Sequence, residues 1–187
     1  MPSATSLTGP SVIKEAGLLQ QIGRLRIVAW QADGELPSFA PQAEGWMDEH
    51  DSHGMNWAFL DEGRPIAAAR KGVHTRIGDL PDLPSLAGYE DLLAPPIAAF
   101  TRLVVGPEFR GLGLSKQLDD VRLAAARSSG CRCAVVVTHL SRRVDQLQQC
   151  GLKVVGRSVH RTASFAPSFV LICEPVNDEY TNTEAHR

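Results

Sequence analysis

The stretch from Val104 to Ser115, which reads V-V-G-P-E-F-R-G-L-G-L-S, constrains the fold of this chain most strongly. An apolar, β-prone run ends at Gly106-Pro107, and a helix-like pattern begins after Gly113. Glycines let a backbone approach a ligand closely, and the first N–H groups of a helix have no partner inside the helix. Because the helix dipole also favours negative charge at that end, the sequence predicts an anion site suited to a pyrophosphate.

Two common phosphate-binding motifs do not account for this loop. A dinucleotide fingerprint needs three spaced glycines that open the first crossover of a parallel sheet, and a nucleotide P-loop needs Gly-Lys-Ser/Thr after four residues. Neither spacing is present. The remaining alternative to an anion site is a glycine-rich turn that only caps the helix.

The segment R-G-L-G-L-S at residues 110–115 resembles the acyl-CoA-binding motif of the GNAT N-acetyltransferase superfamily. In that motif, Gln or Arg is followed by two residues, Gly, one residue, and Gly or Ala. Arg110 and Gly113 match it, and Ser115 replaces the final small residue. The preceding V-x-P-x-x-R spacing also matches, and the resemblance covers roughly Leu18–Cys173. It implies an α/β fold with a mixed central sheet flanked by helices.

Hydrophobic periodicity and turn residues predict the elements of such a fold. Asp79–Pro96 contains four prolines and is expected to be a loop with one short helix around Leu86–Leu93, while Glu35–Glu44 is expected to be a loop or a short helix. The expected helices are Ala16–Ala32, Leu114–Arg127 and Ser141–Cys150, and the expected strands are Met55–Leu60, Pro65–Val73, Ile97–Val105, Cys131–Thr138, Leu152–Val159 and Phe169–Cys173.

Composition favours a single acyltransferase domain over residues 1–187, with flexible tails at 1–10 and 175–187. Hydrophobic residues make up 43% and charged residues 21% of the chain, as in ordinary globular proteins. The net charge of −2 gives no support for binding nucleic acid or a membrane surface. The N-terminus lacks a secretory-signal pattern, and no apolar run approaches the ~20 residues that span a bilayer. We therefore expect a cytoplasmic protein.

The four cysteines lie inside apolar strand or helix patterns, and we expect them to be free thiols. Cys131-x-Cys133 is too tight for the usual zinc-knuckle spacing, and no second pair accompanies it. We therefore expect no metal site.

The resemblance implies acyl transfer from a CoA thioester to an amine, with acetyl-CoA or another acyl-CoA as co-substrate. Backbone groups of Leu103, Val104 and Val105 are expected to pair with the amides of the pantetheine arm. Backbone N–H groups of the loop are expected to hold the pyrophosphate, with added charge from its basic side chains. The loop residues concerned are Arg110, Gly111, Leu112, Gly113, Leu114, Ser115 and Lys116.

The proton source is the weakest part of the resemblance. Family members often place a tyrosine four residues before the glycine that ends the penultimate helix, and an asparagine near the start of that helix. With Gly151 as that glycine, the two positions are Leu147 and Leu140, so neither group is present. His139 follows the strand opposite the thioester and histidine titrates near neutrality, so it is the candidate catalytic residue. The alternative proton sources are water, Ser141 and Cys150. In that case His139 would be a loop histidine bonded to backbone.

Five charged positions resemble the acceptor half of acyl-homoserine lactone synthases and N-acyl amino acid synthases, which acylate small zwitterionic amines. The resemblance implies that four of them bind the acceptor, and that the arginine after Thr101 is also a candidate catalytic residue. The acid that those synthases carry three residues before that arginine falls at Ala99 here. The alternative is that the charges only pair with one another, because buried charges are usually paired. The positions are Arg26, Asp48, Asp51, Arg70 and Arg102, and the last four are the candidate acceptor-binding residues.

Strand alternation predicts where the arginine of this strand points. Phe100, Arg102 and Val104 are expected on one face of the sheet, with Thr101, Leu103 and Val105 on the other. An arginine in the middle of a sheet is costly unless its charge is met. The partner is expected to be Asp48, Asp51 or a carboxylate of the acceptor.

We expect an N-acetyltransferase that moves acetyl from acetyl-CoA to a primary amine of a small molecule by direct attack in a ternary complex. One alternative is an N-acyl amino acid or acyl-homoserine-lactone-type synthase with a longer acyl donor. The other is a catalytically degenerate domain that binds CoA as a sensor or assembly module. A homodimer is compatible with the sequence, and the sequence does not identify the acceptor.

Overall fold

The computed structural model describes residues 7–34, 45–158 and 168–173. These residues build one seven-stranded sheet with the order β1-β2-β3-β4-β5-β7-β6. β4 and β5 run parallel, and the other neighbouring strands are antiparallel. The strands are β1 (Leu7–Ile13), β2 (Met55–Asp61), β3 (Arg64–His74), β4 (Ile97–Val105), β5 (Cys133–Thr138), β6 (Lys153–Arg157) and β7 (Phe169–Cys173).

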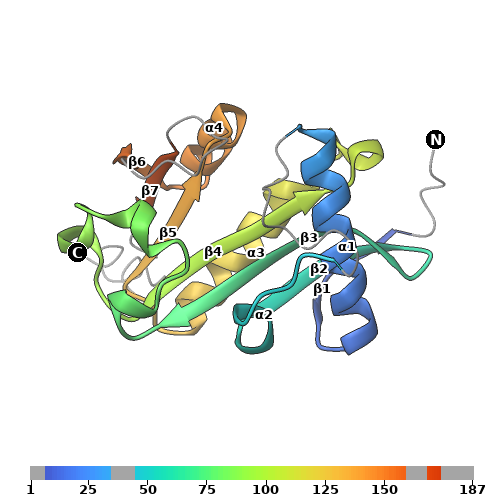
Figure 1. The fold of residues 1–187 in the computed structure, drawn as a ribbon, viewed down its shortest axis with the longest axis horizontal. Helices are drawn as coiled ribbons and strands as arrows, with labels where there is room; N and C mark the ends of the chain where they lie inside the picture. The colour runs from blue at the N-terminus through green and yellow to red at the C-terminus, as the bar shows by residue number, and fades with distance from the viewer. Residues whose placement is uncertain (1–6, 35–44, 159–167, 174–187) are drawn as a thin grey trace, which may run out of the picture.

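Helices cover both faces of the sheet (Figure 1). α1 (Ala16–Ala32) packs on one face of β3 and β4, and α3 (Leu114–Ser128) packs on the opposite face. Alternation along β3 explains this division, because Ala68 belongs to the α1-side core while Ala67 and Ala69 pack against α3. α4 (Ser141–Gln149) lies against β5, β6 and β7, and the short α2 (His50–His53) contacts β3.

Most predicted elements are present close to their expected bounds. α1, β4 and β7 have the bounds that the sequence predicts, and β2, β3, α3 and α4 differ by single residues at their ends. β5 begins two residues later than predicted, and β6 is shorter at both ends. The prediction of a mixed sheet flanked by helices is thus confirmed.

Two expectations about irregular segments are wrong. Residues 7–10, expected in a flexible lead, begin β1, because this edge strand pairs with β2 from Leu7 to Ile13. In place of one short helix around Leu86–Leu93, the structure has three short 3-10 helices, Ile77–Asp79, Leu83–Leu86 and Glu90–Leu92. Prolines remove the backbone donors that a continuous helix would need. Residues 1–6, Glu35–Glu44 and 175–187 lie outside the described residues.

A β-bulge interrupts β4 in its middle. The register against β3 shifts by one residue between the pairs Ala68–Val104 and Arg70–Thr101, and Arg102 has a left-handed φ of 54°. β5 pairs with β4 only over Ile97–Ala99, so the two parallel strands separate beyond that point. A bulge bends its strand and increases the local twist. Among the described residues, the separation leaves the β5-facing edge of Phe100–Val105 without a neighbouring strand.

The bulge overturns the predicted alternation of this strand. Phe100 packs in the core beside α3 and α4, whereas Val104 packs in the core beside α1. Thr101 and Arg102 both face the α1 side, where Arg70 and Asp48 contact them. One inserted residue reverses the side on which every later side chain lies.

Candidate active site

A cavity of about 430 Å³ opens where β4 and β5 separate. Most of the predicted donor-site residues line it. Two do not: Leu112 is 52% exposed, and Lys116 pairs with Asp120 at 2.8 Å on the surface of α3. The predicted residues that line the cavity are Leu103, Val104, Val105, Arg110, Gly111, Gly113, Leu114 and Ser115.

The glycine loop brings free backbone donors to the mouth of this cavity. Gly113 is the N-cap of α3 with a φ of 73°, and no side chain caps the helix. The first turn closes with the N–H of Gln117 on the Gly113 carbonyl, so the N–H groups before Gln117 are not used within the helix. A Cβ built on Gly111 or Gly113 meets no heavy atom within 4 Å. The arrangement leaves room for an anion against the start of a helix.

Asp33, at the end of α1, binds an arginine from each side of the cavity mouth. Arg110 Nη1 and Nη2 donate to the two Asp33 oxygens at 2.9 and 3.1 Å, and Arg110 Nη2 also donates to the Ala29 carbonyl at 3.2 Å. Arg142 on α4 donates to Asp33 at 3.1 Å. A phosphate that takes Arg110 as a ligand must therefore compete with a carboxylate.

Replacing Asp33 with asparagine is expected to tighten CoA binding by about two- to fivefold. The change removes a competitor for Arg110 and a negative charge near the pyrophosphate, and partly exposed ion pairs of this kind contribute up to about 1 kcal/mol. Calorimetric titration with CoA measures the effect. Glu62→Gln, an equal change of charge at the exposed β2–β3 turn, is the control. Unchanged or weaker affinity in Asp33→Asn would contradict this assignment of Arg110.

An ion-pair network lies beyond the bulge on the α1 side of the sheet. Arg26 of α1 donates to both oxygens of Asp51 at 2.8 and 2.7 Å. Arg70 of β3 contacts Asp51 at 2.9 Å and binds both oxygens of Asp48. Arg102 reaches the same carboxylate, with its Nη2 2.7 Å from Asp48 Oδ2. The structure thus brings together all five charged positions that the sequence singled out, three cations against two anions.

The network changes the ionisation of its carboxylates. Burial alone would raise the pKa of Asp48, but hydrogen bonds from Arg70 and Arg102 hold that pKa far below its usual value. The pKa of Asp51 is lowered in the same way by Arg26 and Arg70, against the effect of burial. Both side chains are therefore anions at neutral pH.

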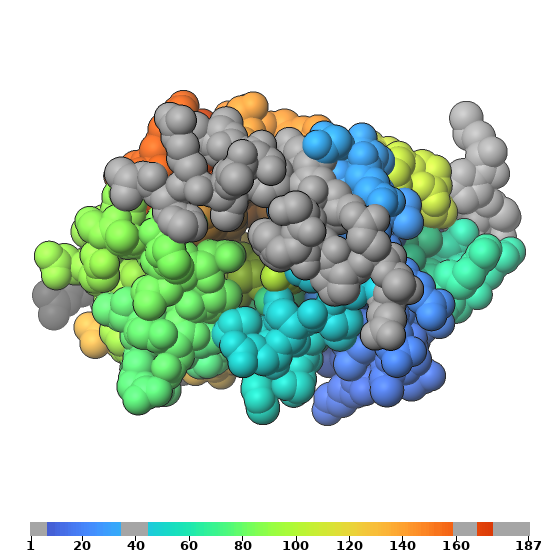
Figure 2. Space-filling model, in the orientation of Figure 1, coloured from blue at the N-terminus to red at the C-terminus, as the bar shows by residue number. Residues whose placement is uncertain are grey.

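Arg102 stands between two cavities. It lines the large cavity and also a smaller one of about 220 Å³, which Asp48, His50 and Asp82 border. Figure 2 shows the segment of 3-10 helices (green) beside the α2 segment (cyan) on this face of the molecule. The Arg102 guanidinium lies 4.1 Å from the centre of the Trp46 ring, and its side chain is 20% exposed. Contacts with Asp48 and Trp46 thus hold the Arg102 side chain, which extends from a left-handed backbone position.

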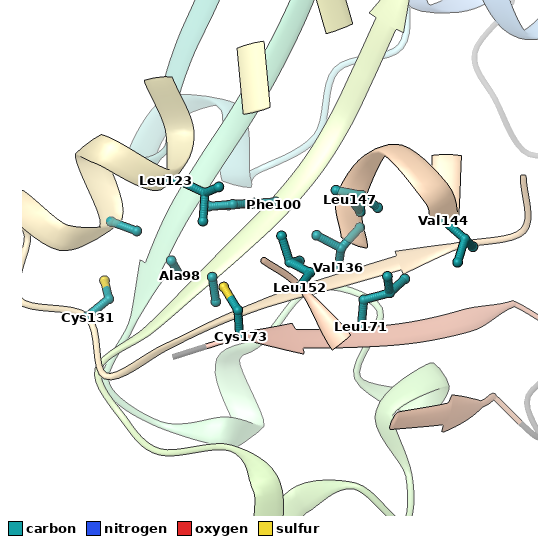
Figure 3. Packing of buried hydrophobic residues seen from close by; sticks show 12 residues of the cluster. Ala98, Phe100, Leu123, Cys131, Val136, Val144, Leu147, Leu152, Leu171 and Cys173 are labelled. Carbon is teal, nitrogen blue, oxygen red and sulfur yellow. The ribbon is translucent and has the colours of Figure 1, made fainter. Parts of the chain in front are cut away.

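The remaining predicted positions divide between the cavity and the core. His139 follows β5, lines the large cavity and packs at a tilt against Trp30 with 5.5 Å between ring centres. Leu140 also lines the cavity. Leu147 is fully buried and points into the core beside Val136 and Leu152 (Figure 3). Position 147 therefore contributes a packed apolar side chain to the core and supplies no acidic group.

The sequence analysis missed several polar residues that line the large cavity, chiefly Arg122, Arg143 and Gln146. Arg122 and Asp119 share the buried face of α3 with Leu118. The signal available in the sequence was this i,i+3 pair of opposite charges inside an apolar stripe. From the sequence alone, an i,i+3 pair of opposite charges on a helix is predicted to be solvent-exposed, unless a second element is known to cover it.

A model of the family described as "Acetyltransferase (GNAT) family" matches residues 19–151. The chain belongs to the GNAT acetyltransferase family. It is an acyltransferase, as the sequence predicts, and the resemblance to the two groups of synthases is confirmed at the level of the fold. No curated protein matches the chain by sequence.

Several solved structures share the fold of this GNAT enzyme at low identity. FeeM, an N-acyl amino acid synthase from uncultured soil microbes, has a TM-score of 0.67 at 11% identity, over 88% of this chain and 89% of its own. The CoA-dependent acyl-homoserine lactone synthase BjaI, solved with SAM and isopentyl-CoA, has a TM-score of 0.66 at 15% identity, over 86% and 77%. An N-acetyltransferase from Staphylococcus aureus has a TM-score of 0.56 at 14% identity, over 89% and 97%.

The described parts of this GNAT enzyme lack two kinds of feature, a membrane-spanning helix and a metal-binding cluster. None of the helices there is long and apolar enough to cross a membrane. Over the same residues, His, Cys, Asp and Glu side chains form no group of three or more that could hold a metal ion. The four cysteines are free thiols.

Proposed function

We propose that this GNAT enzyme transfers an acetyl group from acetyl-CoA to the primary amine of a small molecule, by direct attack of the amine on the thioester in a ternary complex. The observation that carries the proposal is the position of the large cavity. It runs between separated β4 and β5, with the open glycine loop at its mouth and Arg102 among its lining residues. Donor and acceptor can therefore meet beside the bulge.

The unpaired edge of β4 supports the placement of the donor. Because β5 leaves β4 after Ala99, the backbone of Leu103–Val105 offers hydrogen-bonding groups to an extended ligand. A pantetheine arm has amides that pair with such an edge as a further strand would. With its pyrophosphate at Gly111–Ser115, the arm would lead the thioester toward Thr101 and Arg102.

The ion-pair network supports an acceptor that carries a carboxylate. Three guanidinium groups share two carboxylates, and Arg102 is the most exposed of the three arginines. An acceptor carboxylate beside Arg102 would balance the excess charge and orient the amine toward the thioester. This feature also favours a second candidate function, that of an N-acyl amino acid or acyl-homoserine-lactone-type synthase with a longer acyl donor. FeeM and BjaI, which share the fold, support this candidate.

A donor and acceptor panel tests the proposal. Thiol release from acyl-CoAs of increasing chain length would be measured with amino acids and with the corresponding amino acid amides. We expect acetyl-CoA to be used best and the free carboxylates to be preferred over the amides. Faster turnover with long-chain donors would replace the first candidate with the second. Absence of thiol release with every amine would contradict both.

Activity is expected to rise with pH. An acceptor amine with a pKa near 10 must lose a proton before it attacks, and His139 is the one histidine among the described residues that line the cavity. We expect kcat/KM to increase about tenfold per pH unit between about pH 6 and 8. Steady-state rates with saturating acetyl-CoA measure this. A flat profile over that range would show that proton removal from the amine does not limit the reaction.

A further inference from the structure

A buried arginine and a partly buried one, on different helices, share one carboxylate beside the donor cavity. Arg122 of α3 and Arg143 of α4 line the cavity, and both contact Asp119, which is fully buried. Arg143 Nη2 donates to Asp119 Oδ1 at 3.1 Å, and Gln146 Nε2 donates to Asp119 Oδ2 at 3.1 Å. Two guanidinium groups therefore face a single carboxylate, and the cluster has an excess of positive charge.

Arg122 lies at the end of the cavity away from the glycine loop. Its guanidinium is 4.7 Å from the centre of the Phe100 ring, and its Nη1 is 3.5 Å from the Thr101 carbonyl oxygen. Thr101 precedes Val105 by four residues, which is roughly 13 Å along a strand. That span is comparable with an extended pantetheine arm. With the pyrophosphate at the glycine loop, the sulphur of CoA would therefore lie near Arg122.

The cluster has donors left over. Arg122 Nε is buried without a hydrogen-bond partner among the described residues, and the Arg122 side chain is only 1% exposed. Arg143 Nη1 is 2.8 Å from Asp119 Oδ2 but lacks hydrogen-bond geometry toward it. Buried donors are normally paired. The unmet Arg122 Nε, on a residue that lines the cavity, favours an anionic acceptor supplied by a ligand.

Arg143 also occupies the face of α4 on which an acid is missing. It lies one helical turn before Leu147, which is packed in the core. Side chains on a helix lean toward its N-terminus, so a long side chain at position 147 would end near Arg143. The structure therefore has a cation where a proton donor at position 147 would act.

We propose that Arg122 and Arg143 hold the sulphur of CoA as a thiolate when it leaves, in place of protonating it. This inference rests on the function proposed above. The amine nitrogen forms a bond with the thioester carbonyl carbon, and the C–S bond breaks with its electron pair on sulphur. The proton lost by the nitrogen passes to water. The thiolate stays with the two guanidinium groups and is protonated by solvent after release.

The acidity of bound CoA tests this proposal without turnover. Affinities for CoA and for desulfo-CoA, which lacks the sulphur, would be measured by calorimetry as a function of pH. In the wild type, we expect the thiol of bound CoA to be at least about tenfold more acidic than an ordinary thiol with a pKa near 8.5. Arg143→Met should remove most of this increase in the acidity of the bound thiol, whereas Arg143→Lys should preserve it. The isosteric Asp119→Asn should make the bound thiol still more acidic.

Control variants distinguish the effect of Arg122 and Arg143 on the acidity of bound CoA from that of the other charged residues near the cavity. Arg102 comes from β4, His139 follows β5, and Arg110, Arg142 and Asp33 lie at the mouth. His139→Gln should leave the acidity of bound CoA unchanged, and so should Arg64→Met, which removes an exposed charge at the β2–β3 turn. Loss of the effect in His139→Gln would assign it to the imidazole and overturn the proposal.

The outcomes also distinguish this inference from the function on which it rests. If neither CoA nor desulfo-CoA binds, the proposed acyl-CoA site is wrong and the inference falls with it. If both bind equally at every pH, the thiol is not made more acidic and only the inference is wrong. Opposite effects of Arg143→Met and Asp119→Asn would support the inference, because a damaged fold would not change the acidity in opposite directions.

Discussion

Replacing Gly113 with valine is expected to weaken CoA binding by about a hundredfold. Gly113 has a left-handed φ of 73° at the start of α3, and a side chain built on it enters open space at the cavity mouth. Valine is disfavoured in that conformation, and its methyl groups would stand where a pyrophosphate approaches. Loss of one or two charge-assisted hydrogen bonds, at about 1.5–3 kcal/mol each, accounts for the size of the effect. Calorimetric titration with CoA measures it.

The hairpin turn between β2 and β3 offers a matched control for the backbone strain. Gly63 has a φ of 77°, and a Cβ built on it also meets no heavy atom within 4 Å. Gly63→Val should lower the melting temperature about as much as Gly113→Val and leave CoA affinity unchanged. If Gly113→Val binds CoA as the wild type does, the phosphate site has been placed wrongly.

Replacing Asp48 with asparagine is expected to destabilise the protein by about 3 kcal/mol, the lower end of the range for breaking a buried ion pair from one side, because Asp48 is 24% exposed and Arg70 keeps its contact with Asp51. Asp48 binds both Arg70 and Arg102, and Arg70 is almost fully buried. An amide cannot accept from both arginines as a carboxylate does. Thermal melting should show a fall of about 6–12 °C for a chain of this size.

Acid unfolding gives a second measurement of the same contribution. The pKa of Asp48 is lower in the folded protein than in the unfolded chain. The stabilisation is therefore complete above about pH 4 and is lost as the pH falls below that value. Asp48→Asn should lose less stability than the wild type over this acid range. Equal slopes for the two proteins would contradict the assigned pairing.

Arg102→Ala separates stability from acceptor binding. This change leaves Asp48 paired with Arg70, so the loss of melting temperature should be clearly smaller than in Asp48→Asn. The acceptor KM should rise while CoA affinity stays near the wild-type value. A large fall in melting temperature with parallel loss of CoA binding would make Arg102 a structural residue.

The sequence predicts the elements that have strong local signals. α1 has a clear helical period, and β4 is an apolar run bounded by Pro96 and Gly106, so their ends were predicted correctly. The glycine loop was recognisable because its glycines and the helix start that follows them together indicate an anion site within one short segment. β1 was missed because Gly9-Pro10 interrupts its short sequence, which becomes a strand only through pairing with β2.

The bulge at Arg102 could not be predicted from β4 alone. A bulge is a mismatch in residue count between two paired strands, so the sequence of one strand alone does not reveal it. The consequence for the site was large, since the prediction placed Arg102 with Phe100 and Val104, which lie on opposite faces. Arg122 and Arg143 were missed for a similar reason, because their burial depends on how α3 and α4 meet.

The short ladder between β4 and β5 has a mechanical consequence. In the part of the chain that the structure describes, only three residue pairs join the two halves of the sheet: Ile97–Cys133, Ala98–Ala134 and Ala99–Val135. A CoA molecule lying in the gap would connect the two halves of the sheet, because it would be hydrogen-bonded to one half and enclosed by the other. Its binding free energy would then add to the cohesion between the halves. As more of the protein is bound to CoA, the resistance of β5, β6 and β7 to local opening would thus increase.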